Sequence, residues 1–222
     1  AALAADERAK ALVVTGSGRA FCSGADLVSF LAQAGDEQSS IAEQVGRSMD
    51  AAFNPLVGAL MEFPKPVVTA INGIAAGGGA AISLCADLIV AGEARMLKFV
   101  QVPQLGLVAD LGGNWLLQRI AGRSVALAAI LLGETISAER AERLGIFWEV
   151  VKDSDLLERA CDIARALTLV PREAVIASRR LVDLSATASF GDMLNLESLS
   201  QQDLALRPEL IEKVRAFMAS RR

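Results

Sequence analysis

Two glycine-containing turns could direct backbone amides at one point. The segments are Phe21-Cys-Ser-Gly-Ala-Asp-Leu27 and Asn72-Gly-Ile-Ala-Ala-Gly-Gly-Gly-Ala-Ala81, and each is expected to follow a strand and open a helix. The amides of Ala25 and Gly78 would then lack an intrahelical acceptor. Two such amides facing the same place form an oxyanion hole, which stabilises negative charge that develops during a reaction. The alternative is that both segments are only close-packing turns.

A single carboxylate stands in an otherwise apolar run, Leu105-Gly-Leu-Val-Ala-Asp-Leu-Gly-Gly-Asn-Trp115. This residue, Asp110, either caps the following helix or is held in an apolar pocket, where acid–base chemistry becomes available. The sequence contains no His and no Tyr, so the usual general base near pH 7 is missing. Proton transfer must therefore use carboxylates, thiols, hydroxyls, lysine or backbone amides. Asp26, beside the first turn, has a similar alternative role as an acid favoured by the helix dipole.

Composition excludes several function classes. The formal net charge of −4 argues against a nucleic-acid surface, because phosphate binding needs clustered Lys and Arg. Cys22, Cys85 and Cys161 lie far apart without CxxC spacing, so we expect no disulfide framework and no metal site. We interpret them as small buried hydrophobes in a reducing cytoplasm. No Gly-Lys pair is present, which excludes a P-loop.

The elements that must position these residues alternate between strands and helices in the first part of the chain. Strands are expected at Ala11–Thr15, Pro66–Ile71 and Leu88–Ala91, and apolar spacing predicts a helix over Ile41–Phe63. Such alternation is typical of parallel βαβ units.

The pattern changes near residues 122–133, and helices predominate afterwards. We therefore divide the chain into an α/β core over residues 1–130 and a helical region over residues 131–222. In the second region Ser137 is expected to cap a short helix. The further elements expected there are a strand at Phe147–Val151 and helices at Asp155–Leu169, Pro171–Ser185, Asp192–Leu206 and from Pro208 onward.

The segment Pro66–Ala86 has no charged residue and is long enough to cross a bilayer. Its Asn72-Gly73 turn and its run of three glycines from Gly77 predict a strand, a glycine turn and a buried helix instead, so we expect no membrane span. The first residues lack the basic region of a signal peptide and an initiator Met. We therefore expect the chain to begin inside a longer protein.

Four motifs together resemble the enoyl-CoA hydratase/isomerase (crotonase) family, in that family's order and spacing and over nearly the whole chain. They are Gly18–Leu27, Pro64–Gly79, Cys85–Leu88 and Ile136–Gly145. The resemblance implies an α/β protein with the crotonase (ClpP-like) fold, which is a spiral core of ββα units with a C-terminal helical trimerisation region. It also implies that the opening strands of the family lie before Ala1.

The resemblance further implies a coenzyme A thioester as substrate, with its carbonyl oxygen between the amides of Ala25 and Gly78. Binding there stabilises the enolate that forms when a proton leaves the α-carbon. No separate cofactor or metal is implied, because coenzyme A is part of the substrate, and no nucleic-acid or membrane partner is expected. A homotrimer or homohexamer in the cytoplasm is the implied state. The residues expected along the coenzyme A groove are Ser23, Asp26, Leu27 and Gly77.

The sequence departs from the family's hydratase pattern, which carries two catalytic glutamates. The first position is Ala81, the second falls near Val102 or Pro103, and no Glu occurs between Glu93 and Glu134. Water addition normally needs one group for water and another for the α-proton.

Asp110 stands where several isomerases of the family carry an aspartate. An isomerase with Asp110 as its single acid–base residue is therefore the favoured function. The stretches Asn54–Val57, Gly112–Trp115 and Ile146–Val150 look most like the ring-opened epoxyphenylacetyl-CoA isomerase branch.

Two other functions stay open. The chain could be a hydratase, and thus a lyase, that uses Asp110 with a positioned water. It could also be a non-catalytic acyl-CoA-binding protein in which Asp110 only caps a helix.

Overall fold

The computed structural model describes residues 2–34 and 38–220 as two compact units. The first unit runs to Leu167 and the second begins at Thr168. Both sheets lie in the first unit, and the second unit is built from helices. The predicted segments of interest, including both glycine turns and Asp110, therefore belong to the first unit.

The first sheet contains the longer strands and is entirely parallel. It consists of β1 (Leu12–Thr15), β3 (Val67–Ile71), β5 (Leu88–Gly92) and β8 (Glu149–Val151), in the order β1-β3-β5-β8. Every residue of β3 is buried. Parallel strands that are covered on both faces read as continuous apolar runs, which is why these strands are predicted from the sequence.

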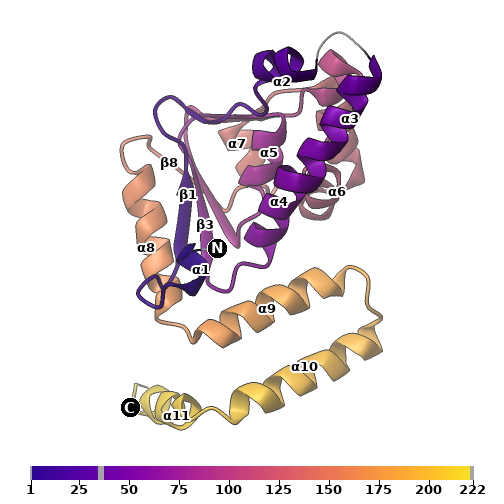
Figure 1. Ribbon diagram of the computed structural model, residues 1–222. Helices are drawn as coiled ribbons and strands as arrows, with labels where there is room; N and C mark the ends of the chain where they lie inside the picture. The colour runs from indigo at the N-terminus through magenta and orange to yellow at the C-terminus, as the bar shows by residue number, and fades with distance from the viewer. Residues whose placement is uncertain (1, 35–37, 221–222) are drawn as a thin grey trace. The chain divides into compact units, whose positions relative to one another are not determined.

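Successive residues of the central strands pack into different cores. Val68 and Val90 pack with the helix α8 (Leu156–Thr168), whereas Ile71 and Ala91 belong to the larger core on the opposite face. Figure 1 shows α8 lying along one side of this sheet. This alternation follows from the two-residue repeat of a strand. The sheet is therefore a rigid middle layer of the first unit.

The second sheet is formed by strands of two or three residues. It consists of β2 (Ala20–Cys22), β4 (Ile74–Ala76), β6 (Met96–Lys98) and β7 (Ile136–Ser137), in the order β2-β4-β6-β7. Its pairs are parallel except for β6 with β7, which is antiparallel. The sequence does not predict these four strands, because they are too short to show a two-residue repeat.

The helices surround the sheets. The predicted helix over Ile41–Phe63 lies in one continuous helical stretch that ends at Met61 and has a π-helical segment in its middle. The predicted Ser137 cap is present, because its side chain accepts a hydrogen bond from the Arg140 amide. The helical segments of the first unit besides α8 are α1 (Ala2–Ala5), α2 (Leu27–Ala34), α3 (Gln38–Ser48), η1 (Met49–Phe53), α4 (Asn54–Met61), α5 (Gly78–Ser83), η2 (Gln101–Leu105), α6 (Gly113–Leu132) and α7 (Ala138–Arg143).

The uncharged segment Pro66–Ala86 forms β3, a turn, β4 and α5, so the expected strand, glycine turn and helix are present, with β4 in addition. Among the described helices, α6 alone is long and apolar enough to cross a membrane. Its backbone leaves helical geometry at Gly122, at φ 81° and ψ 162°, and several of its residues are buried. Core helices of water-soluble proteins pass the same test of length and composition.

The border between the compact units lies later in the chain than the change of pattern near residue 130. Strand β7 pairs with β6, and β8 pairs with β5. Residues 131–167 thus join the first unit through two strands of its sheets. The physical reason is strand pairing, which joins segments far apart in sequence whatever their local composition.

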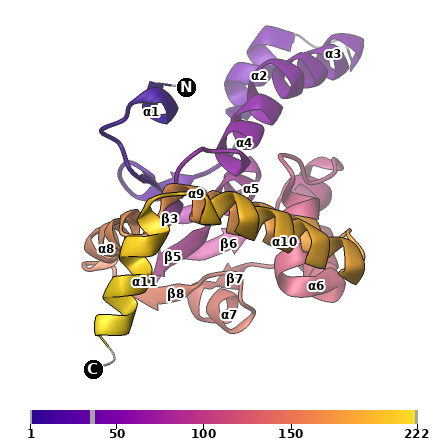
Figure 2. The same ribbon diagram turned by 90° about the horizontal axis from the view of Figure 1, so that it is seen from below.

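The second unit contains α9 (Arg172–Ser185), α10 (Phe190–Ala205) and α11 (Glu209–Ala219). Helices α9 and α10 pack against each other in opposite directions (Figure 1), and Figure 2 shows α10 and α11 from below. The start of α10 is capped by Ser189, which accepts a hydrogen bond from the Asp192 amide. Several apolar side chains of α10 and α11 are exposed, among them Phe190 and Phe217.

The cysteines are free. Cys85 is buried as expected, and burial raises the pKa of its thiol to about 12, so it stays neutral near pH 7. Cys22 and Cys161 are only partly buried.

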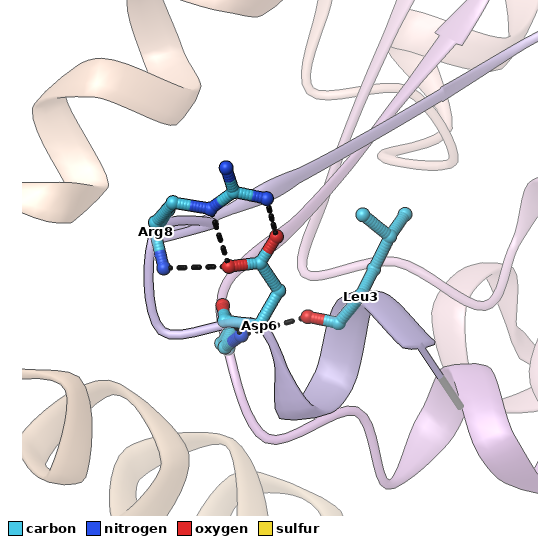
Figure 3. Close-up of polar contacts among 4 residues, drawn as sticks. Leu3, Asp6 and Arg8 are labelled. Carbon is cyan, nitrogen blue, oxygen red and sulfur yellow. Dashed lines mark hydrogen bonds and ion pairs between the residues drawn. The ribbon is translucent and has the colours of Figure 1, made fainter.

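A buried lysine ties the N-terminal segment to the loop before β3. Lys65 is 3% exposed, and its Nζ donates to the carbonyl oxygens of Leu3 at 2.7 Å and Asp6 at 2.8 Å. Asp6 also forms an ion pair with Arg8, and the hydrogen bonds from Arg8 lower the pKa of the Asp6 carboxyl. Figure 3 shows this pair beside the carbonyl of Leu3. The buried ammonium group therefore has two of its acceptors in the folded N-terminal segment.

We expect Lys65→Met to lower the free energy of unfolding by about 1–3 kcal/mol, because the Leu3 carbonyl oxygen loses the ammonium donor and the Asp6 carbonyl oxygen keeps only the amide of Ala9. Urea unfolding of the 222-residue chain measures this change. Lys10→Met, at an exposed position, is the matched control and should change the value by less than about 0.5 kcal/mol. Equal effects of the two substitutions would contradict the anchoring role of Lys65.

Candidate active site

The two glycine turns meet because the strands before them are neighbours. Strand β2 pairs in parallel with β4, with Cys22 opposite Ala75. The carboxyl ends of parallel neighbours lie at the same edge of a sheet, where loops form crevices. The residues after Cys22 and the residues after β4 therefore emerge side by side.

The turns approach each other at backbone distance. A Cβ atom on Gly24 would lie 3.2 Å from the carbonyl oxygen of Ala76 and 3.4 Å from the amide nitrogen of Gly78. Gly24 has φ +96° and Gly77 has φ +56°, which side chains rarely allow. Glycine is thus required at Gly24 by both its conformation and this close approach.

The amides of Ala25 and Gly78 are available as donors. Neither donates a hydrogen bond to any residue that the structure describes. Gly78 is the first residue of α5, where backbone amides have no partner inside the helix. Adjacent turns thus present two unpaired donors, an arrangement suited to holding an oxyanion.

The carboxylate of Asp110 lies beside the second turn. Its Oδ1 atom is 3.8 Å from the place that a Cβ atom on Gly78 would occupy. The same oxygen accepts a hydrogen bond from Nε2 of Gln101 at 2.9 Å. The fold thus brings the predicted acid–base residue to the predicted amides, although Asp110 and Gly78 are distant in sequence.

The side chain of Asp110 does not cap α6. The residue before that helix is Gly112, and no side chain caps it. The backbone carbonyl of Asp110 instead accepts a hydrogen bond from the Gly113 amide at 2.8 Å. The intervening residue, Leu111, is buried and has φ +51°, the left-handed region that costs a side-chain-bearing residue energy. The tight turn that directs Asp110 is therefore strained.

Gln101 is a site residue that the sequence analysis missed. It is 5% exposed, and its Oε1 accepts a hydrogen bond from the Val100 amide at 3.1 Å. The only signal for it in the sequence is a polar side chain in the short run Lys98–Leu105, with no motif that assigns it a partner.

The other predicted site residues lie on or next to the same turns. The carbonyl oxygen of Ser23 is 3.9 Å from the place of a Cβ atom on Gly77. Leu27 begins α2 and is 47% exposed. Asp26 caps α2, because its carboxylate accepts hydrogen bonds from the amides of Val28 and Ser29 and from the Ser29 hydroxyl. These bonds, above all the one from the Ser29 side chain, lower the pKa of Asp26.

The positions expected for two glutamates carry apolar residues, of which Ala81 is buried, Val102 is half-buried and Pro103 is exposed. Ala81 is fully buried, and a Cβ atom added to Gly113 would lie 3.4 Å from the Cβ of Ala81. Val102 and Pro103 lie in η2. Among the described residues no group of three or more metal-ligating side chains is assembled. The carboxylate beside the two amides is therefore that of Asp110.

The chain matches the family model for enoyl-CoA hydratase/isomerase over residues 1–218. It is 38% identical to the 1,2-epoxyphenylacetyl-CoA isomerase of Escherichia coli K12 over 217 residues, which cover 97% of this chain and 80% of that protein. It is also 36% identical over 218 residues to a Rhodobacter capsulatus protein named "Probable enoyl-CoA hydratase", covering 96% of this chain and 79% of the other.

Solved structures show the same fold. The enoyl-CoA hydratase of Bacillus anthracis matches with a TM-score of 0.87 at 27% identity, over 99% of this chain and 82% of that one. The expected crotonase fold, with parallel sheets and a C-terminal helical region, is thereby confirmed. The motifs, the paired turns and these matches together show that the chain belongs to the enoyl-CoA hydratase/isomerase family.

Proposed function

We propose that the protein is an acyl-CoA isomerase in which Asp110 is the single residue that moves protons. The observation that carries this proposal is the position of its carboxylate, 3.8 Å from the Cβ site of Gly78, while Ala81 is apolar. One carboxylate is enough to remove a proton at one carbon and return it at another. A site with one carboxylate beside the amides therefore fits isomerisation better than hydration, which normally uses two carboxylates.

The proposed reaction begins when the thioester oxygen accepts hydrogen bonds from the amides of Ala25 and Gly78. In a 3-enoyl thioester Asp110 removes a proton from C2, and the electron pair spreads over the C3–C4 double bond and the thioester oxygen. The two amides stabilise the negative charge on that oxygen. Asp110 then returns the proton at C4, which leaves a 2-enoyl thioester and the original carboxylate.

The branch of the family supports the same choice. The E. coli relative is named for the isomerisation of 1,2-epoxyphenylacetyl-CoA. A second candidate substrate class for this site is therefore an aromatic acyl-CoA thioester, and a second candidate reaction is the opening of a ring. A hydratase is the alternative function, favoured by the similarity to the Rhodobacter protein and to the Bacillus structure. It would need Asp110 to act with a positioned water. A protein that binds acyl-CoA without turnover is the remaining alternative.

We also propose a homotrimer or homohexamer in the cytoplasm. The exposed apolar side chains of α10 and α11, such as Phe190, Leu199 and Phe217, support the assembly. The free cysteines support a reducing compartment. The acidic net charge supports the absence of a nucleic-acid partner.

The substitution Asp110→Asn tests the acid–base role. We expect it to lower the rate of conversion of 3-enoyl-CoA to 2-enoyl-CoA by about 10²- to 10⁴-fold, because the amide cannot accept the proton. Absorbance of the conjugated thioester follows the reaction, and mass spectrometry shows whether water has been added.

Asp50→Asn, at an exposed position in η1, is the matched control and should leave the rate unchanged. A gain of one water by 2-enoyl-CoA, lost in the Asp110 variant, would favour the hydratase. Tight binding without turnover of either substrate or of aromatic acyl-CoA thioesters would contradict any catalytic function.

The substitution Gly78→Ala tests the oxyanion site. Its new methyl group would meet Cδ1 of Leu111 at 2.6 Å and stand 3.8 Å from Asp110 Oδ1. We expect kcat/KM to fall roughly 10²-fold, because the thioester can no longer reach its reactive position. Gly46→Ala in α3, where a Cβ atom meets nothing within 4 Å, should leave kcat/KM unchanged. A fully active Gly78 variant would exclude this placement of the substrate.

A further inference from the structure

Gln101 is buried with a fixed orientation of its amide. Its Oε1 accepts the N–H of Val100 at 3.1 Å, and an amide nitrogen in that place would face another donor. The Nε2 group must therefore point to the opposite side, where it meets Asp110 Oδ1 at 2.9 Å. A flipped side chain would lose both hydrogen bonds at once.

The backbone around Gln101 holds the residue in place. Its carbonyl oxygen accepts hydrogen bonds from the amides of Gly106 and Leu107, which close the turn at the end of η2. Gly106 has φ +65°, so the chain reverses immediately after η2. Gln101 and Asp110 thus lie at the beginning and at the end of one short segment, residues 101–110. The donor to the carboxylate is built into the same segment that carries the carboxylate.

The two oxygens of the Asp110 carboxylate have different surroundings. Oδ1 accepts the hydrogen bond from Gln101, whereas none of the residues that the structure describes donates to Oδ2. An N–H group directed at Oδ1 occupies one of that oxygen's two lone pairs and lowers its basicity relative to Oδ2. Protonation of the carboxylate is therefore directed to Oδ2. Hydrogen bonds to ionised groups are strong, so this asymmetry persists while the carboxylate is charged.

The strained turn at Leu111 limits the backbone movement of Asp110. Leu111 holds φ +51° and is 6% exposed, so the backbone next to Asp110 has little freedom to turn. Gln101 is then the side chain that decides the rotation of the carboxylate about its own bond. Without it, the two oxygens would exchange places by a simple rotation.

We propose that Gln101 is a positioning residue that makes Asp110 Oδ2 the oxygen that takes the proton from the substrate and returns it. This inference rests on the proposed isomerase function. In the first step the C2–H bond breaks, Oδ2 gains the proton and the electron pair remains on the dienolate. In the second step Oδ2 gives the same proton to C4. The hydrogen bond at Oδ1 prevents the rotation that would carry this proton toward water between the two steps.

The proposal predicts that part of the isotope moves directly from one carbon to the other. The experiment uses 3-enoyl-CoA with deuterium at both C2 positions in ordinary water, and mass spectrometry with NMR measures the fraction of product with deuterium at C4. We expect the wild-type product to carry measurable deuterium at C4. In Gln101→Met this fraction should fall several-fold, kcat should fall about 10- to 100-fold, and KM should stay within about twofold.

The control variants separate positioning from folding. Gln101→Leu also removes the donor to Asp110, so the fraction of deuterium at C4 should fall as in Gln101→Met. Gln104→Met alters an exposed residue of the same turn and should leave the fraction unchanged. The fraction is measured per turnover, so it does not depend on how much of a variant is folded.

Three other outcomes of the isotope experiment would each contradict one part of the proposal. If the wild type moves the double bond but both Gln101 variants keep its fraction of deuterium at C4, the positioning role is wrong and the isomerase function stands. A wild-type product without deuterium at C4 overturns the direct transfer by Oδ2. If the wild type does not move the double bond at all, the proposed function fails and the role of Gln101 fails with it.

Discussion

The contact between the backbones of Gly24 and the Gly77–Gly78 pair is the constraint on which the candidate site depends. A side chain on Gly24 would lie only 3.2 Å from the oxygen of Ala76, so the turns can approach this closely only if that residue is glycine. The approach places two unpaired amides at one edge of the second sheet. Backbone donors held in this way need no rearrangement when charge develops on a substrate, which is the source of their effect.

The sheets keep these turns rigid. The buried strand β3 packs into a core on each of its faces, and Asn72 directly after it accepts a hydrogen bond from the Gly16 amide and donates to the Gly18 carbonyl. The loop that leads into β2 is thereby attached to the end of β3. Sites supported by packed strands hold their geometry better than sites on free loops.

The surroundings of Asp110 combine apolar packing with one buried polar side chain. Ala81 is buried beside Gly113, and the buried polar side chain that contacts the carboxylate is that of Gln101. A buried amide is acceptable only when its hydrogen bonds are made, and here both its oxygen and its nitrogen have partners. The carboxylate of Asp110 is thus held in one orientation by a side chain whose own hydrogen bonds are made.

The sequence alone predicted the longer strands and the glycine turns, and it marked the two amides and Asp110 as candidate site residues, because these depend on local residue types and on apolar runs. It could not predict β2, β4, β6 and β7, since two or three residues show no repeat, and pairing partners lie far away in the chain. Only the tertiary structure decided that Asp110 binds Gln101 instead of capping α6, and that both lie beside Gly78. These outcomes depend on which strands pair and how a strained loop folds back, which no local pattern encodes.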